Sequence, residues 1–179
     1  FVMEIHGGAF KMGDKSSTPL QSEVLAAGIA IVKINYRYSS TDIWPAQGQD
    51  CLAAVAFLRA HGADYGLDPA RMALWGQSAG GFLAVSTAIS LSEAGQPVLG
   101  AVDFFGPMDF STMDSDMAAL GMVAAMGATN DIASPESQLL GFDVTLDPAA
   151  ARAAGEPMQG DSPPKRPSRH RHHHCGNQR

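Results

Sequence analysis

The pentapeptide GQSAG at residues 76–80 constrains the fold of this 179-residue chain more than any other feature. It follows an apolar run at residues 72–75 that is typical of a buried strand, and it precedes a helix-like stretch over residues 81–93. The small residues at both ends of the pentapeptide allow neighbouring backbone to pass close without a Cβ clash. The pattern therefore predicts a sharp strand-to-helix turn that holds Ser78 at its apex.

The segment HGGAF at residues 6–10 is the second informative motif, and it closes another strand-like apolar run. Backbone N–H groups that converge in such a loop stabilise a negative charge that develops on an oxygen atom. We expect the donors to be the N–H groups of Gly8 and Ala9 together with that of Ala79, next to the serine. Taken alone, the segment indicates only a turn after a strand. The serine turn about seventy residues later favours the oxyanion-loop interpretation.

Apolar runs alternate with helix-like stretches along the first two thirds of the chain. We expect strands at 1–6, about 29–36, 71–76 and 98–105, and helices at 47–61 and 80–93. Such alternation predicts an α/β fold with a mostly parallel sheet and helices on both of its faces.

Residues 1 to about 155 resemble an α/β-hydrolase of the esterase and lipase group, near the hormone-sensitive-lipase-like and the feruloyl- and acetyl-xylan-esterase-like families. Besides the two motifs, the resemblance rests on NYRYS at 35–39, YGLDPAR at 65–71 and FGPMD at 105–109. It implies a partial α/β-hydrolase fold and hydrolysis of small-molecule carboxylic esters by a Ser-His-Asp triad. Ser78 is then the nucleophile.

The resemblance fails after about residue 155, where the next core strand of the family should begin. In this family the triad acid and histidine follow the nucleophile, each in a loop after a later strand, and neither setting is present here. Residues 156–179 form instead a His- and Pro-rich tail with a net charge of +3, against −9 for residues 1–155. Such a composition predicts disorder. A basic interaction tail and a frameshifted end are both compatible with it, and the abrupt change favours the second.

We therefore expect a hydrolase fragment, cut at both ends, whose sheet lacks its last strands. An exposed sheet edge would invite self-association. Without a triad histidine, the ester hydrolase activity of the fragment is expected to be impaired. Asp109 is one candidate for a stand-in triad acid. The alternative function is a non-catalytic binding module on the same fold.

Residues 110–155, the cap segment from here on, change in character. Helix-like stretches start at Ser115, at Ser134-Pro135 and at Asp147-Pro148, and each ends at a glycine. They predict an insertion over the sheet. Five methionines lie in its first part or just before it, and they indicate either an adaptable apolar cover for the substrate or ordinary helix packing: Met108, Met113, Met117, Met122 and Met126.

Composition excludes several other classes of protein. The acidic body disfavours nucleic acid as a partner, and no apolar run is long enough to suggest a membrane span. We predict neither a cofactor nor an evolved metal site, because the histidines at 170–174 lie in a polar run without fixed neighbours. Cys51 lies in a helix pattern and is expected to be buried, so a disulfide with Cys175 is not expected. Localisation stays open, since an export signal would precede Phe1.

Overall fold

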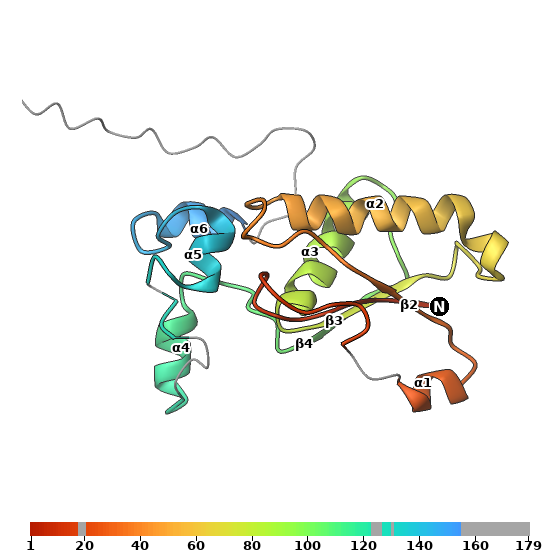
Figure 1. Ribbon diagram of the computed structural model, residues 1–179, viewed down its shortest axis with the longest axis horizontal. Coiled ribbons are helices and arrows are strands. Elements are labelled where there is room, and N and C mark those ends of the chain that lie inside the picture. Colours follow the sequence, from red (N-terminus) through yellow and green to blue (C-terminus); the bar gives the residue numbers. More distant parts are fainter. Residues whose placement is uncertain (18–20, 123–126, 130, 155–179) are drawn as a thin grey trace, which may run out of the picture.

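The computed structural model describes residues 1–17, 21–122, 127–129 and 131–154 (Figure 1). The elements are, in chain order, β1 (Val2–Ile5), α1 (Ser22–Ala26), β2 (Ile31–Ile34), α2 (Ala46–His61), the 3-10 helix η1 (Gly62–Tyr65), β3 (Ala73–Gln77), α3 (Ala79–Glu93), β4 (Ala101–Phe104), α4 (Met113–Ala119), α5 (Pro135–Leu140) and α6 (Pro148–Ala154). The predicted strands and long helices are present, although the strands are shorter than the apolar runs. Sequence patterns did not predict α1 or η1.

The four strands form one parallel sheet in the order β2-β1-β3-β4. Val2 pairs with Ile31 on one side and with Ala73 on the other, so β1 is central. Because the strands are parallel, the loops that follow them all leave from the same end of the sheet. This arrangement confirms the predicted α/β fold.

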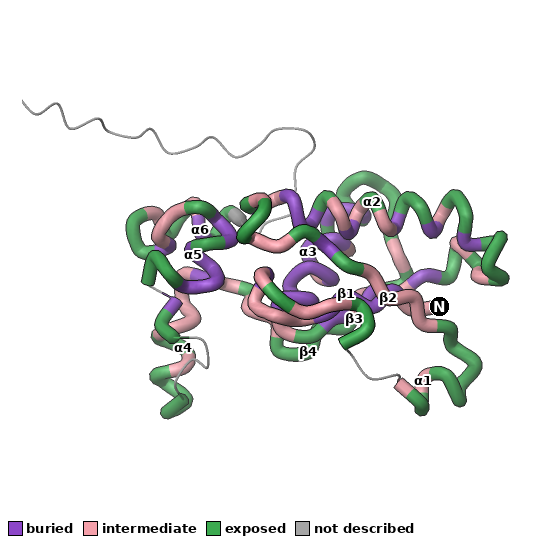
Figure 2. Tube along the Cα trace, viewed as in Figure 1, coloured by how far each residue is buried: buried purple, intermediate pink, exposed green. Residues whose placement is uncertain are grey.

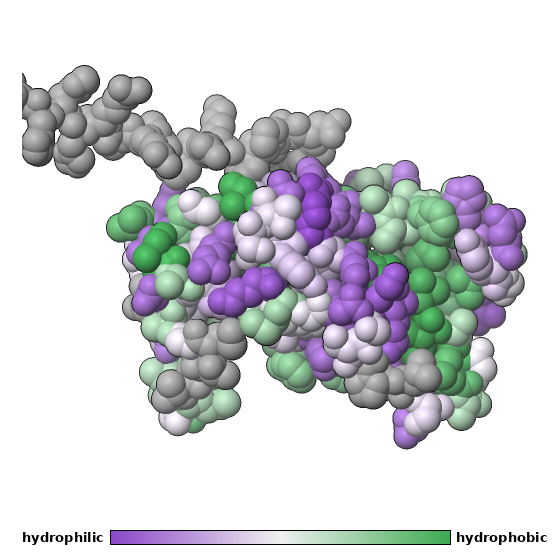
Figure 3. All heavy atoms as spheres, viewed as in Figure 1, coloured by the Kyte–Doolittle hydropathy of each residue, from purple (hydrophilic) through white to green (hydrophobic). Residues whose placement is uncertain are grey.

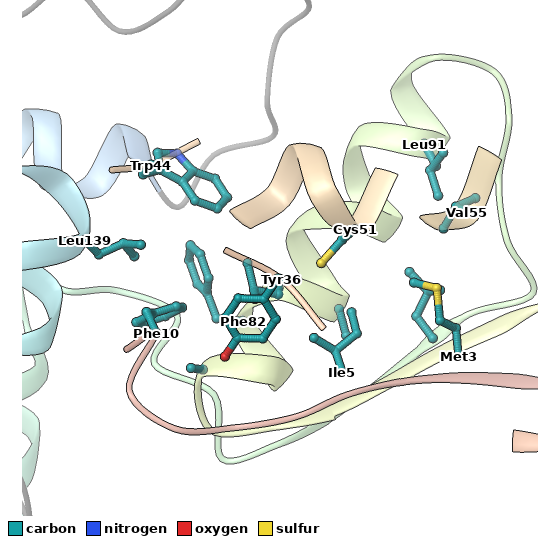
Figure 4. Packing of buried hydrophobic residues seen from close by; sticks show 14 of the residues in the cluster. Met3, Ile5, Phe10, Tyr36, Trp44, Cys51, Val55, Phe82, Leu91 and Leu139 are labelled. Carbon is teal, nitrogen blue, oxygen red and sulfur yellow. The ribbon is translucent and has the colours of Figure 1, made fainter. Parts of the chain in front are cut away.

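The register places Met3, Val32, Leu74 and Ala101 on one face of the sheet. The helices α2 and α3 cover this face, and their apolar side chains pack into it (Figure 4). Met3, Leu74 and Cys51 are fully buried there. Burial raises the pKa of the Cys51 thiol to about 12, so this predicted core cysteine stays protonated at neutral pH.

The opposite face is covered far less. Figure 1 shows α1 on this side, and none of its residues is buried. Val102 and Phe104, which alternate with the inward residues of β4, are 47% and 42% exposed. Burial is accordingly concentrated in α3 and the inner side of α2, whereas α1 and β4 are largely open to solvent (Figure 2).

Strands β2 and β4 form the two edges of the sheet within the described residues. Large apolar side chains are exposed beside each edge, with Ile29 before β2 and Leu99 before β4. Figure 3 shows apolar surface beneath α2 on the β2 side of the molecule. Self-association through an edge stays a prediction. In the described part of the chain, no helix combines the length and apolar character needed to cross a membrane.

The helices of the cap segment lie at the end of the sheet toward which the strands run (Figure 1). As predicted, α5 is capped by Ser134, whose hydroxyl accepts a hydrogen bond from the Ser137 N–H at 3.0 Å, and by Gly141 at its other end. In contrast, α4 spans Met113–Ala119 and ends well before Gly127. The predicted domain limits at 155/156 and the tail lie outside the described residues, so they stay predictions.

Candidate active site

Ser78 occupies the sharp turn between β3 and α3 that the sequence predicts. Its backbone has φ 53° and ψ −127°, a conformation that residues with a Cβ atom rarely adopt. The turn is held by a hydrogen bond of 2.9 Å from the Ser78 N–H to the Phe104 carbonyl of β4. Although Ser78 is the N-cap residue of α3, its side chain makes no capping hydrogen bond. The hydroxyl is therefore not used to stabilise the helix.

The glycines of the turn are required by contacts with neighbouring backbone. A Cβ atom on Gly80 would lie 2.1 Å from the Ile5 carbonyl oxygen and 2.6 Å from that of His6. A Cβ atom on Gly76 would lie 2.1 Å from the carbonyl oxygen of Gly80. All three distances are too short for a non-bonded carbon–oxygen contact, so the start of α3 passes the ends of β1 and β3 at a distance that only glycine permits.

The loop that follows β1, residues 6–13, is called the HGG loop from here on. It lies directly beside the serine turn, because β1 and β3 are neighbours in the sheet. A Cβ atom on Gly7 would lie 3.4 Å from the Ser78 Cβ. Gly7, Gly8 and Ser78 line one hollow of about 410 Å³, whose other lining residues are His6, Met12, Gly13, Ser17, Gln77 and Phe105. The predicted adjacency of the two motifs is thus confirmed.

The loop is anchored by the segment that follows β2. The Tyr36 hydroxyl donates to the His6 carbonyl at 3.1 Å, and the Tyr38 hydroxyl donates to the Gly13 carbonyl. In addition, the Ser39 N–H donates to the Phe10 carbonyl at 2.8 Å. These bonds explain the NYRYS segment, which sequence reasoning noted without assigning a role to its tyrosines. They hold both ends of the HGG loop.

His6 is part of the hydrogen-bonded framework of the loop. Its ring is buried, stacks on Tyr36 at 4.5 Å between centroids, and places Nδ1 2.7 Å from the Gly7 carbonyl oxygen. A carbonyl oxygen only accepts, so Nδ1 carries the proton in this contact. The buried Nε2 has no hydrogen-bond partner among the described residues.

The predicted oxyanion donors are only partly gathered around the hollow. Gly8 lines it, whereas Ala9 and Ala79 are not among the lining residues. The backbone of Ala9 has φ 52°, another left-handed conformation in this loop. Within the described residues, no hydrogen bond uses the N–H of Gly8, Ala9 or Ala79 as its donor. The three groups therefore have no hydrogen-bond acceptor in the described structure, and their role as oxyanion donors stays a prediction.

A base and an acid are not assembled around Ser78 within the described residues. His61 ends α2 at the opposite end of the sheet, where its ring lies 4.8 Å from that of Phe57 at an angle of 37°. Asp109 accepts hydrogen bonds from Ser111 and pairs with Arg152 of α6 at 3.3 Å. Its pKa is lowered chiefly by the Ser111 hydroxyl. These partners give Asp109 a structural role that joins β4 to the cap segment.

The methionines at the start of the cap segment are not brought to the hollow. Met108 is 42% exposed and Met122 is 55% exposed. Met113 packs against the main core, which agrees with ordinary helix packing. Met126 lies outside the described residues. Instead, the apolar side chains that line the hollow are Met12 and Phe105, which sequence reasoning did not single out. Phe105 is the last residue of the predicted strand 98–105, and Met12 lies two residues after the HGGAF segment. Their nearness to the two quoted motifs is the signal that could have found them.

Two further observations bear on the chemistry of the site. Arg37 pairs with Asp50 through four hydrogen bonds of 3.1 Å or less, one from its backbone N–H and three from its guanidinium, and with Asp42 at 3.3 Å. It therefore links the segment after β2 to α2. Across the described ranges, no group of three or more His, Cys, Asp or Glu side chains is arranged to hold a metal ion. The histidines of the tail lie outside these ranges.

Comparison with known proteins gives consistent matches. The family model described as BD-FAE matches residues 1–160. The chain is 35% identical over 127 residues to the probable carboxylic ester hydrolase LipM of Mycobacterium tuberculosis, covering 65% of this chain and 30% of that protein. It is 33% identical over 108 residues to an acetyl-hydrolase of Streptomyces hygroscopicus, covering 59% and 35%. The chain thus spans about a third of the length of these curated relatives.

Solved structures show the same arrangement. A truncated form of a carbohydrate esterase from gut microbiota superposes with a TM-score of 0.64 at 29% identity, over 78% of this chain and 54% of that one. A bacterial heroin esterase superposes with a TM-score of 0.59 at 26% identity, over 93% and 48%. Each of these relatives is named for the hydrolysis of esters or acetyl groups.

Proposed function

Because the chain belongs to the BD-FAE family, within the α/β-hydrolase superfamily, we propose that the intact protein hydrolyses small carboxylic esters with Ser78 as the nucleophile. One observation carries the proposal. Ser78 is held at φ 53° with its hydroxyl free of any capping bond, and it shares a hollow with the HGG loop. A backbone conformation that is costly at a serine, beside a glycine-rich loop, is typical of a functional site.

The reaction consists of two acyl transfers. The Ser78 Oγ bonds to the ester carbonyl carbon while a base takes its proton, and the carbonyl oxygen becomes negative. The N–H groups of Gly8, Ala9 and Ala79 donate no hydrogen bond within the described residues, and they would stabilise that charge. The alcohol then leaves with the proton, and water attacks the acyl-serine in the same manner, releasing the acid and restoring the serine.

The base and the acid are assigned by the family resemblance to residues beyond the fold described here. His6 is engaged with the Gly7 carbonyl and buried, and Asp109 is engaged with Arg152. We therefore propose that the 179-residue chain by itself is nearly inactive. Triad members act as a unit, and removing the base from well-studied hydrolases forfeits most of a rate gain on the order of 10⁶.

The test is the hydrolysis of p-nitrophenyl acetate and butyrate by the full-length protein that contains this chain. Ser78→Ala should lower kcat/KM by at least about 10³-fold, because the nucleophile is lost. Ser92→Ala, in the exposed last turn of α3, is the matched control and should leave the rate unchanged. Equal rates for the protein and its Ser78→Ala variant would remove the nucleophile assignment.

The same experiment separates the enzyme from a non-catalytic binding module. A binding module would show no turnover in the full-length form while still holding an ester in the hollow of Ser78. A further measurement applies to the 179-residue chain alone. If that chain hydrolyses the esters at the full-length rate in a Ser78-dependent manner, the missing-base account is wrong.

A further inference from the structure

Phe105 combines two unfavourable features in one residue at the edge of the Ser78 hollow. Its backbone has φ 51°, which is an outlier for a bulky side chain. Its ring is 77% exposed, the largest exposure of any aromatic side chain among the described residues. Neither the positive φ nor the exposed ring stabilises the fold. Positions of this kind are concentrated at functional sites.

The backbone around Phe105 is held on both sides. The preceding carbonyl, that of Phe104, accepts the Ser78 N–H at 2.9 Å, so the turn of the nucleophile and the turn of Phe105 share a hydrogen bond. On the other side, the Gly106 N–H donates to the Asp103 carboxylate at 2.8 Å. A Cβ atom on Gly106 would lie 2.5 Å from Met108 Cε and 2.7 Å from the Phe82 nitrogen. The neighbours therefore impose the conformation of Phe105.

The ring is one of two large apolar side chains that line the hollow, and the other is Met12, which is 50% exposed. The remaining lining residues are glycines or polar. Met12 belongs to the HGG loop, where its N–H donates to the Gly8 carbonyl at 3.0 Å. Both apolar side chains thus extend from loops whose backbone also frames Ser78.

From this arrangement we propose that Phe105, together with Met12, binds an apolar group of the ester substrate and sets the preference for its length. The inference rests on the proposed function of Ser78. Because the backbone that carries the ring is held in advance, binding of a ligand orders only the two side-chain torsions of Phe105, and the entropic cost is correspondingly small. The ring therefore strengthens the binding of substrates that carry several methylene groups, and it contributes little to the binding of the shortest esters.

The test compares Phe105→Gly with the unmodified full-length protein on two ester series. One series lengthens the acyl group, from p-nitrophenyl acetate to octanoate, and the other lengthens the alcohol, from ethyl to octyl acetate. KM should rise roughly 10-fold for the long member of one series, which corresponds to about 1.4 kcal/mol, while KM for the shortest esters changes less than about 2-fold. The series that responds identifies the bound group.

The melting temperature distinguishes a binding role of Phe105 from a purely structural one. If the ring only supported the fold, Phe105→Gly would lower the Tm. Glycine adopts positive φ without strain, and little apolar area is lost at a ring that is 77% exposed, so the Tm of Phe105→Gly should not fall. Phe57→Ala removes another half-exposed aromatic ring, on α2, and should leave KM for every ester unchanged. Phe105→Leu should retain most of the preference for long esters.

Two results would overturn the inference. One is an unchanged KM for long esters in Phe105→Gly, and the other is a fall in Tm accompanied by an equal loss of kcat for all esters. If Ser78→Ala keeps full activity, the proposed function fails separately. Binding of octanoate, measured by calorimetry, then decides the role of Phe105 without turnover. Equal affinity of the protein and its Phe105→Gly variant would contradict it.

Discussion

The turn region, residues 5–13 and 76–81, and the cap segment lie at the same end of the sheet but are held by different interactions (Figure 1). In the turn region, backbone meets backbone: a Cβ atom on Gly80 would collide with the carbonyl of Ile5. In the cap segment, side chains make the contacts, as when Leu139 of α5 is buried in the core. The α4 helix buries no residue at all.

The difference shows which residues tolerate change. Where backbones are in contact, one added methyl group has no space, so the residue type itself is required. Where side chains pack, another apolar residue of similar volume is tolerated at modest cost. Under the proposed function, the preference among esters can therefore vary through exposed side chains such as Phe105, while the geometry around Ser78 stays constant.

The largest effect is expected for Gly80→Ala. The new Cβ atom would lie 2.1 Å from the Ile5 carbonyl oxygen, and neither the central strand β1 nor the start of α3 can move without separating the core. We expect the free energy of unfolding to fall by more than about 4 kcal/mol, measured by urea denaturation. Gly100→Ala is the control, since its Cβ would meet nothing within 4 Å, and it should be nearly neutral. Similar values for the two variants would contradict the backbone-contact account.

A smaller effect is expected for Leu139→Ala in the cap segment. Leu139 is fully buried, and its carbonyl accepts the Trp44 N–H at 2.8 Å, so α5 is attached to the segment before α2. The truncation should cost about 2–4 kcal/mol of unfolding free energy through the cavity it leaves. Leu139→Met should cost less than about 1.5 kcal/mol because it preserves volume. A loss under 1 kcal/mol for the alanine variant would mean that the cap segment is not packed on the core.

The smallest effect concerns Asp109 and depends on pH. Its pKa is lowered chiefly by the Ser111 hydroxyl, with further help from Arg152. A carboxylate whose pKa is lowered in the folded state stabilises the protein at pH values above the ordinary pKa of aspartate. This stabilisation is lost as the pH falls through the lowered pKa of the folded state. Asp109→Asn should therefore cost less than about 1 kcal/mol at pH 6, since the carboxylate is 35% exposed, and the difference should shrink below pH 4. Ser111→Ala should show the same trend. A difference that grows on acidification would contradict this assignment.

Much of the fold follows from local patterns. The apolar runs predicted the order of strands and helices, and Gly141 predicted the end of α5. Both signals are local, because hydrophobic periodicity and helix capping act within a few residues. The site was predicted less completely. The motifs identified Ser78 and the HGG loop. The hydrogen bonds that the Tyr36 and Tyr38 hydroxyls donate to that loop, however, join residues about 25 to 30 positions apart. No local signal carries such a contact.

Local chemistry alone was enough to locate the strand-to-helix turn at Ser78 and the glycines beside it, because backbone sterics restrict those positions to very few residue types. The tertiary structure alone placed Phe105 and Met12 at the hollow, and it engaged Asp109 with Arg152 instead of with a catalytic histidine. The physical reason is that long-range contacts depend on which strands become neighbours and how their loops are anchored. That is decided by the packing of the whole sheet against α2 and α3.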